Sequence, residues 1–150
     1  MPSKQSLSQH QYYAHPQNAF WWIMSNLLGF SEKSSYQHRC DQLTNKGYAL
    51  WDVLYDAERK TSLDSDIVRD TIVVNDIEGL LKTYPSIKML AFNGVTAKQI
   101  FLKHCSHLLD QNESLQYVQL PSTSPAYAAI NRQQKLIIWQ KQLLHFEVEN

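Results

Sequence analysis

The sequence predicts an α/β fold in which helices cover both faces of a parallel sheet. Short apolar segments alternate along the chain with segments whose apolar residues recur every three or four positions, an alternation typical of parallel sheets. The segment IKMLAFNG (87–94) is almost continuously apolar and ends in Asn-Gly, as expected of a buried parallel strand. A length of 150 residues is that of one domain, so we expect a single domain over residues 1–150.

The expected elements follow from the same patterns. The polar, proline-punctuated segment 1–17 is expected to be loop. The apolar residues of AFWWIMSNLLG have helical spacing, which predicts a helix over 19–28 that ends at Gly29, and a second helix is expected to end at Gly47. The rest of the chain is expected to contain strands over 48–54, 87–93 and 115–120, helices over 75–84 (capped by its first residue, Asn75), 95–104 and 131–146, and a surface loop over 56–70.

Composition and charge exclude several classes of protein. The hydrophobic fraction of 43% and the charged fraction of 19% are those of an ordinary globular protein. Because 14 basic and 14 acidic residues cancel, any nucleic-acid surface has to be a local patch or use backbone amides. Cys40 and Cys105 lie far apart, which excludes a cysteine-ligated metal centre built by this chain alone and is typical of a reducing compartment. The apolar segment AFWWIM is too short to span a bilayer, so we expect a cytoplasmic protein.

The segment QYYAHPQNAFWWIM (11–24) concentrates polar and aromatic side chains near the start of the chain. The simplest interpretation is that Asn18 caps the helix that follows, since asparagine is among the best N-caps. On that interpretation His15 is a solvent-facing loop residue. The functional interpretation is that Tyr13 offers a flat face to a planar ligand while Asn18 orients a water molecule. Spacing alone favours the cap.

The segment LPSTSPAY (120–127) is a second candidate. Serine, threonine and proline clusters of this kind most often form turns with side-chain-to-backbone hydrogen bonds. The functional alternative is a hydroxyl- and amide-rich loop that grips a phosphate backbone. In FNG (92–94) the glycine is expected to supply a positive φ between strand and helix. Asp64, a lone acidic residue in SLDS (62–65), is expected to form hydrogen bonds within a local turn.

Taken together, the segments MPS, QYYAHPQNAFWWIM, GYALWDVL, SLDSDI, FNG and LPSTSPA resemble, in this order, the hypoxanthine-DNA (deoxyinosine) glycosylase branch of the uracil-DNA glycosylase superfamily. The resemblance spans essentially the whole chain and is most specific in its first and last motifs. It implies a three-layer α/β/α sandwich around a short, four-stranded parallel sheet. The family's first strand runs into a G-S-M-P loop, and Met1-Pro2-Ser3 resemble the end of that loop, so the N-terminal strand is expected to be missing.

The resemblance also implies roles for the first motif. Asn18 matches the Asn of H-P-x-N, which takes the catalytic role in this branch by orienting a water beneath C1′ of the sugar. Tyr13 matches the position whose ring stacks on the flipped base, and His15 and Phe20 are expected to bind the base as well. A neutral amide cannot deprotonate water, so the mechanism is expected to be largely dissociative, with stabilisation of the leaving base lowering most of the barrier.

The second motif is implied to bind DNA. In it Ser122, Thr123 and Ser124 are expected to grip backbone phosphates, whereas Pro125 and Ala126 occupy the place where the superfamily inserts a wedge into the duplex. The family usually continues with Asn, but this chain has Tyr127, whose ring could stack in the gap that the flipped base leaves. No motif histidine follows, which argues against strong uracil activity.

The resemblance therefore predicts a monofunctional DNA glycosylase that flips out and excises deaminated bases, hypoxanthine first, in base excision repair. It implies no metal and no cofactor, and its partner is double-stranded DNA containing a deaminated base, with no obligate protein partner. The enzymatic alternative is a uracil or G·U mismatch glycosylase. The alternatives from other classes are a non-catalytic lesion-binding remnant and an unrelated α/β domain.

Overall fold

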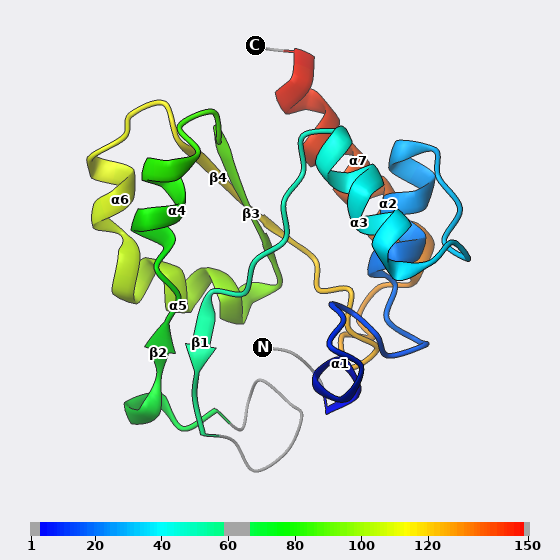
Figure 1. Cartoon of the computed structure of the whole chain (residues 1–150), viewed down its shortest axis with the longest axis horizontal. Helices are drawn as coiled ribbons and strands as arrows, with labels where there is room; N and C mark the ends of the chain where they lie inside the picture. Colours follow the sequence, from blue (N-terminus) through cyan, green and yellow to red (C-terminus); the bar gives the residue numbers. More distant parts are fainter. Residues whose placement is uncertain (1–3, 59–66, 149–150) are drawn as a thin grey trace. The chain divides into compact units, whose positions relative to one another are not determined.

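The computed structural model describes residues 4–58 and 67–148, whose elements are drawn in Figure 1. The chain divides into two compact units. The first, which we call the α/β unit, comprises Asp52–Ser122. The second, the helical unit, comprises the described residues up to Trp51 together with those from Thr123 onward.

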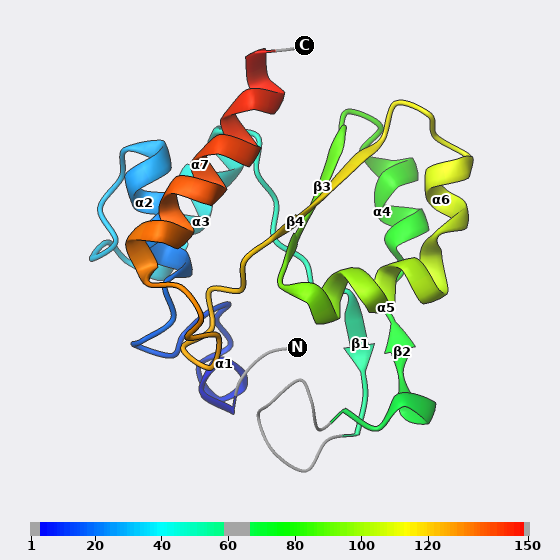
Figure 2. The same ribbon diagram turned by 180° about the vertical axis from the view of Figure 1, so that it is seen from behind.

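The α/β unit is built on two parallel strands, β3 (Met89–Asn93) and β4 (Gln116–Leu120). In both views the helices lie on one side of this pair, namely α4 (Ile77–Thr83), α5 (Val95–Cys105) and α6 (His107–Asp110) (Figures 1 and 2). The core between them consists of Ile77, Phe92, Phe101, Cys105 and Leu108. The predicted parallel pairing of the segments around 89–93 and 116–120 is therefore confirmed.

The strand expected over 48–54 is wrong in both position and pairing. The observed strand β1 (Leu54–Asp56) pairs antiparallel with β2 (Val73–Val74), which follows the 3₁₀ helix η2 (Arg69–Thr71). The side chain of Asn75 donates to the carbonyls of Asp52 at 2.7 Å and Leu54 at 3.2 Å, and its N–H donates to that of Val53 at 2.9 Å. These bonds satisfy the carbonyls without a parallel ladder. Within the described residues the parallel sheet thus has two strands, not the three expected from the pattern.

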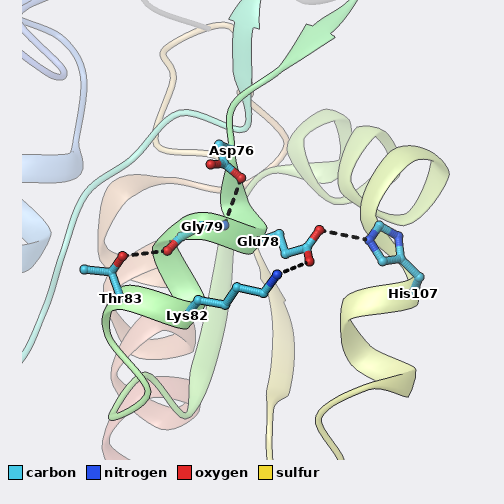
Figure 3. Close-up of polar contacts among 6 residues, drawn as sticks. All are labelled: Asp76, Glu78, Gly79, Lys82, Thr83 and His107. Carbon is cyan, nitrogen blue, oxygen red and sulfur yellow. Dashed lines mark hydrogen bonds and ion pairs between the residues drawn. The ribbon is translucent and has the colours of Figure 1, made fainter.

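Helix α4 is capped by Asp76 and not, as expected, by Asn75. The carboxylate of Asp76 accepts the N–H of Gly79 at 2.8 Å, a bond that is drawn in Figure 3. A Cβ at position 79 would meet this carboxylate, so glycine leaves room for the cap. On the exposed side of the same helix, the hydrogen bond from Lys82 at 2.6 Å holds the pKa of Glu78 below its usual value. Exposed pairs of this kind stabilise little, and the N-cap is the stronger signal for where the helix begins.

The turn between β3 and α5 has the predicted glycine conformation. Gly94 has φ +105°, and a Cβ at this position would lie 3.2 Å from the Cβ of Ser122. Any larger residue would be strained there. Gly94 and Ser122 are therefore neighbours at the carboxyl ends of β3 and β4. On α5, Ile100 and Phe101 are buried, whereas His104 is exposed.

The helical unit contains α1 (Lys4–Gln9), α2 (Phe20–Leu28), α3 (Tyr36–Asn45) and α7 (Arg132–Val148). The predicted ends of the second and third of these are confirmed, since Gly29 and Gly47 follow them with φ of 76° and 80°. Helix α2 packs against α7 and α3. No helix within the described ranges is long and apolar enough to cross a membrane.

Helix α1 lies in a segment that was expected to be loop. Ser6 explains why the segment folds, because it is buried and bonds twice to the chain that follows. Its carbonyl accepts the N–H of Gln11 at 3.0 Å and its hydroxyl accepts the N–H of Ala14 at 3.2 Å. These bonds attach α1 to the beginning of the aromatic segment 11–24.

Candidate active site

The two candidate segments of the sequence meet in the helical unit. The N–H of Ala19 donates to the carbonyl of Thr123 at 3.0 Å, although 104 positions separate them in the chain (123 minus 19). Ala19 is 8% exposed and Thr123 is 1% exposed, so this hydrogen bond is shielded from water and fixes the beginning of α2 against the second segment.

Asn18 lies immediately before α2, and its side chain bonds to the helix that it precedes. Its Oδ1 accepts the N–H of Phe20 at 3.0 Å, and its own N–H donates to the carbonyl of His15 at 2.9 Å. The predicted cap is off by one position, since the N-cap of α2 is Ala19, but the side chain of Asn18 still makes a capping bond because it satisfies an amide of the first turn. The capping bond uses one lone pair of the side-chain oxygen. The amide group of Asn18 also has a second lone pair on this oxygen and two N–H donors.

Tyr13 has an unusual backbone conformation. Its φ is 55°, in the left-handed region that a bulky residue seldom adopts. Its ring stacks on the ring of Phe20, with centroids 4.0 Å apart and planes inclined by 22°. Phe20 is 3% exposed and meets Trp21 and Trp139 edge-on. One face of the half-buried Tyr13 ring therefore rests on the aromatic core of the helical unit.

The segment that carries Tyr13 is attached on its other side through Tyr12. The carbonyl of Tyr12 accepts the indole N–H of Trp21 at 2.9 Å, and its N–H donates to the hydroxyl of Tyr36 at 3.1 Å. Burial raises the pKa of Tyr36, which keeps that hydroxyl protonated. The guanidinium of Arg39 lies 4.5 Å from the centroid of Trp21. Together these contacts give the aromatic segment a defined conformation before any ligand arrives.

His15 is half-buried in the same segment. Its Nδ1 accepts the N–H of Gln17 at 3.2 Å. An accepting Nδ1 carries no proton, so the neutral ring carries its proton on Nε2. The imidazole therefore has a hydrogen-bond donor available on the nitrogen that Gln17 does not occupy.

The second segment forms a tight turn. The N–H of Tyr127 donates to the carbonyl of Ser124 at 3.1 Å, and the N–H of Ala126 donates to the hydroxyl of Ser124 at 3.2 Å. Pro125 occupies the second turn position, where its fixed φ is favourable. The turn predicted from the sequence is thus confirmed. Pro125, Ala126 and Tyr127 are exposed at its tip, whereas the side chain of Thr123 is buried, so the phosphate contact predicted for Thr123 stays a prediction.

Lys135 lies beneath this turn, and sequence reasoning missed it because no lysine stood out as buried. It is only 4% exposed, and its Nζ donates to the carbonyls of Tyr127 at 2.8 Å and Ser124 at 3.2 Å. Burial lowers the pKa of Lys135. A signal was present, since it precedes the buried Trp139 and Leu143 by four and eight positions and so shares their helix face.

Two segments about which the sequence makes predictions lie outside the described residues, namely Met1-Pro2-Ser3, which resemble the end of a family loop, and the loop residue Asp64. Of the residues predicted to bind DNA, Ser122 belongs to the α/β unit. The others share the helical unit with the predicted base-binding and catalytic residues, and the two sets are Thr123, Ser124, Pro125 and Ala126 on the one hand and Tyr13, His15, Asn18 and Phe20 on the other. Within the ranges that the structure describes, no group of three or more His, Cys, Asp or Glu residues could hold a metal ion.

Comparison with known proteins shows the family to which the chain belongs. The model of the Uracil DNA glycosylase superfamily matches residues 1–144. The chain belongs to this superfamily. The resemblance predicted from the sequence motifs is therefore confirmed.

Relatives within the superfamily agree with this assignment. Two proteins named hypoxanthine DNA glycosylase, from Methanosarcina barkeri and Methanosarcina acetivorans, are 34% and 33% identical over 95 residues. The match covers 63% of this chain and 59% of the length of each relative. A solution NMR structure from Methanosarcina acetivorans, of a protein provisionally named a uracil DNA glycosylase, aligns with a TM-score of 0.71 and 28% identity. It covers 93% of this superfamily member and 84% of the solved chain, which confirms the predicted α/β class.

Proposed function

We propose that this superfamily member is a monofunctional DNA glycosylase that excises deaminated bases, hypoxanthine first, by hydrolysing the N-glycosidic bond of deoxyinosine in double-stranded DNA. The observation that carries the proposal is the buried hydrogen bond from Ala19 to Thr123. It joins a segment that holds an amide, an imidazole and an aromatic face to a turn with an exposed tip. The names of the two curated relatives support hypoxanthine as the base.

Each group has a place in this reaction. The flipped base would stack on the face of Tyr13 opposite Phe20, which supports the ring from behind at 4.0 Å. Nε2–H of His15 would donate to the departing base, on which negative charge develops. Asn18 would orient the attacking water with the donors and the lone pair that its capping bond leaves. Ser122, Thr123 and Ser124 would contact phosphates, and Pro125 and Ala126 would enter the duplex.

The direct test is single-turnover excision on duplexes that carry one deoxyinosine or one deoxyuridine. We expect abasic sites at deoxyinosine, formed faster than at deoxyuridine, without added metal or cofactor. Faster cleavage at deoxyuridine would favour the second candidate, a uracil or G·U mismatch glycosylase, which the provisional name of the solved relative supports. Lesion-specific binding with no abasic product would contradict both glycosylase functions and would indicate a lesion-binding protein without catalytic activity.

Removal of the Tyr13 ring is expected to slow excision of hypoxanthine by about 10- to 100-fold, because stacking of a base on an aromatic ring contributes about 1–3 kcal/mol. Tyr13→Ala removes the stacking face, whereas Tyr13→Phe keeps it. The measurement is the single-turnover rate of both variants on the deoxyinosine duplex. Equal rates for the alanine and phenylalanine variants would show that the base does not stack at this position.

A further inference from the structure

The structure contains a buried ammonium whose hydrogen-bond acceptors belong to the turn at 124–127. Lys135 donates to the carbonyls of Ser124 and Tyr127, and its Nζ lies 5.2 Å from the centroid of the Tyr127 ring. Both carbonyls belong to the main chain of the turn. Lys135 therefore contacts the first and last residues of the turn and one face of its aromatic side chain.

Burial of this charge is costly for the fold, and an apolar side chain of similar size would fill the same space more cheaply. Its neighbours Trp139 and Leu143 on α7 show that the surrounding helix face is otherwise apolar. Of the polar contacts that Lys135 makes, both go to the turn. The presence of a lysine at this buried position is thus explained by its two hydrogen bonds to the turn.

The same carbonyl of Ser124 also accepts the N–H of Tyr127. The ammonium and the turn amide thus share one acceptor. With Lys135 in place, the turn can open only if a partly buried, charge-assisted bond is broken. The main chain of the turn is thus held at both ends by Lys135, while the side chain of Tyr127 remains 41% exposed. An exposed aromatic ring on a turn that is already held loses less conformational freedom when it enters a base stack.

We propose that Lys135 is a positioning residue that holds the turn 124–127, and with it the ring of Tyr127, ready to occupy the gap in the duplex from which the target base has been flipped. The inference rests on the proposed glycosylase function and extends it to residues outside the base-binding segment. Lys135 touches neither base nor sugar. It acts through Tyr127, on extrusion of the base and not on cleavage of the bond.

If Lys135 acts on extrusion of the base, its loss should affect double-stranded and single-stranded substrates differently. A base in single-stranded DNA is already free of its partner, so it needs less help to leave the stack. Lys135→Met keeps the aliphatic stem but removes the donors. We expect this variant to excise hypoxanthine from a duplex about 10- to 100-fold more slowly, and from the same strand without its complement at a rate within about threefold of the unmodified protein.

Further variants separate positioning from general damage to the fold. Tyr127→Ala changes an exposed residue and should produce the same selective loss on the duplex. Because both residues act through one turn, the double variant should be no slower than the slower single variant. The matched control is Lys141→Met, which alters an exposed lysine of the same helix and should leave both rates unchanged.

A second measurement does not depend on activity. Amide hydrogen exchange at Tyr127 in the DNA-free protein should be about tenfold faster or more in Lys135→Met, since the turn loses its two hydrogen bonds to the ammonium. Unchanged exchange, an unchanged duplex rate, or equal slowing on duplex and single strand would each overturn the proposal. If the unmodified protein cleaves neither substrate, the proposed function fails, and the exchange experiment still decides whether Lys135 orders the turn.

Discussion

Replacing Asn18 with alanine is expected to slow excision of hypoxanthine from a deoxyinosine duplex by about 100- to 1,000-fold, because the water loses the group that orients it. Binding to the same duplex should change little, since the aromatic and turn residues remain. The measurement pairs single-turnover excision with equilibrium binding. Excision that survives at more than about a tenth of the original rate would remove Asn18 from the reaction.

The capping bond of Asn18 makes a stability control necessary. Its Oδ1 accepts the N–H of Phe20, so the alanine variant should also lose about 1 kcal/mol of stability. Asn26→Ala is the matched control, because Asn26 is an exposed residue of α2 whose side chain donates to the carbonyl of Trp22, one turn earlier in the same helix. It should retain excision. Asn18→Asp keeps an acceptor for Phe20 and therefore separates the cap from the donors that the amide contributes.

Phe20→Ala is expected to destabilise the protein by about 3–5 kcal/mol, because a buried aromatic ring is lost and a cavity replaces it. Phe20 is 3% exposed and contacts the rings of Tyr13, Trp21 and Trp139. The measurement is the free energy of unfolding in denaturant, followed by tryptophan fluorescence. A loss below about 1 kcal/mol would show that this ring is not part of the core.

The matched variant is Phe101→Ala, which removes a ring that is 1% exposed in the core of the α/β unit. The sequence predicts one domain over residues 1–150, and the pair of variants tests this directly. In a single cooperative domain, both substitutions shift one and the same transition. Two transitions, each shifted by only one of the variants, would contradict the single-domain prediction.

Much of the candidate site could be predicted from the sequence, because its residues lie in two short segments with distinctive composition. Tyr13, His15 and Asn18 fall within six positions of one another, as do Thr123 and Tyr127. Two features could not be predicted. The side chain of Asn18 makes a capping bond and still has N–H donors for a water molecule, and the side chain of Thr123 is buried. Local composition does not indicate which side of a turn faces the interior.

The errors in the predicted fold have a common origin. The expected strand over 48–54 and the expected cap Asn75 both failed because this asparagine bonds to the carbonyls of Asp52 and Leu54, more than 20 positions away. Helix α1 was missed because Ser6, which closes it against Gln11 and Ala14, carries no apolar signal. In each case a polar side chain forms a hydrogen bond that neither residue propensity nor hydrophobic periodicity predicts.

The sequence by itself determined the α/β class, the ends of α2 and α3, the glycine turn after β3 and the superfamily, because these depend on local spacing, positive φ and short motifs. Only the tertiary structure decided how the two segments meet and what supports them. The bond between Ala19 and Thr123, the support of Tyr13 by Phe20 and the burial of Lys135 beneath the turn join parts of the chain that do not reveal each other in sequence. The physical reason is that a buried donor takes the acceptor that packing brings to it, wherever that acceptor lies in the chain.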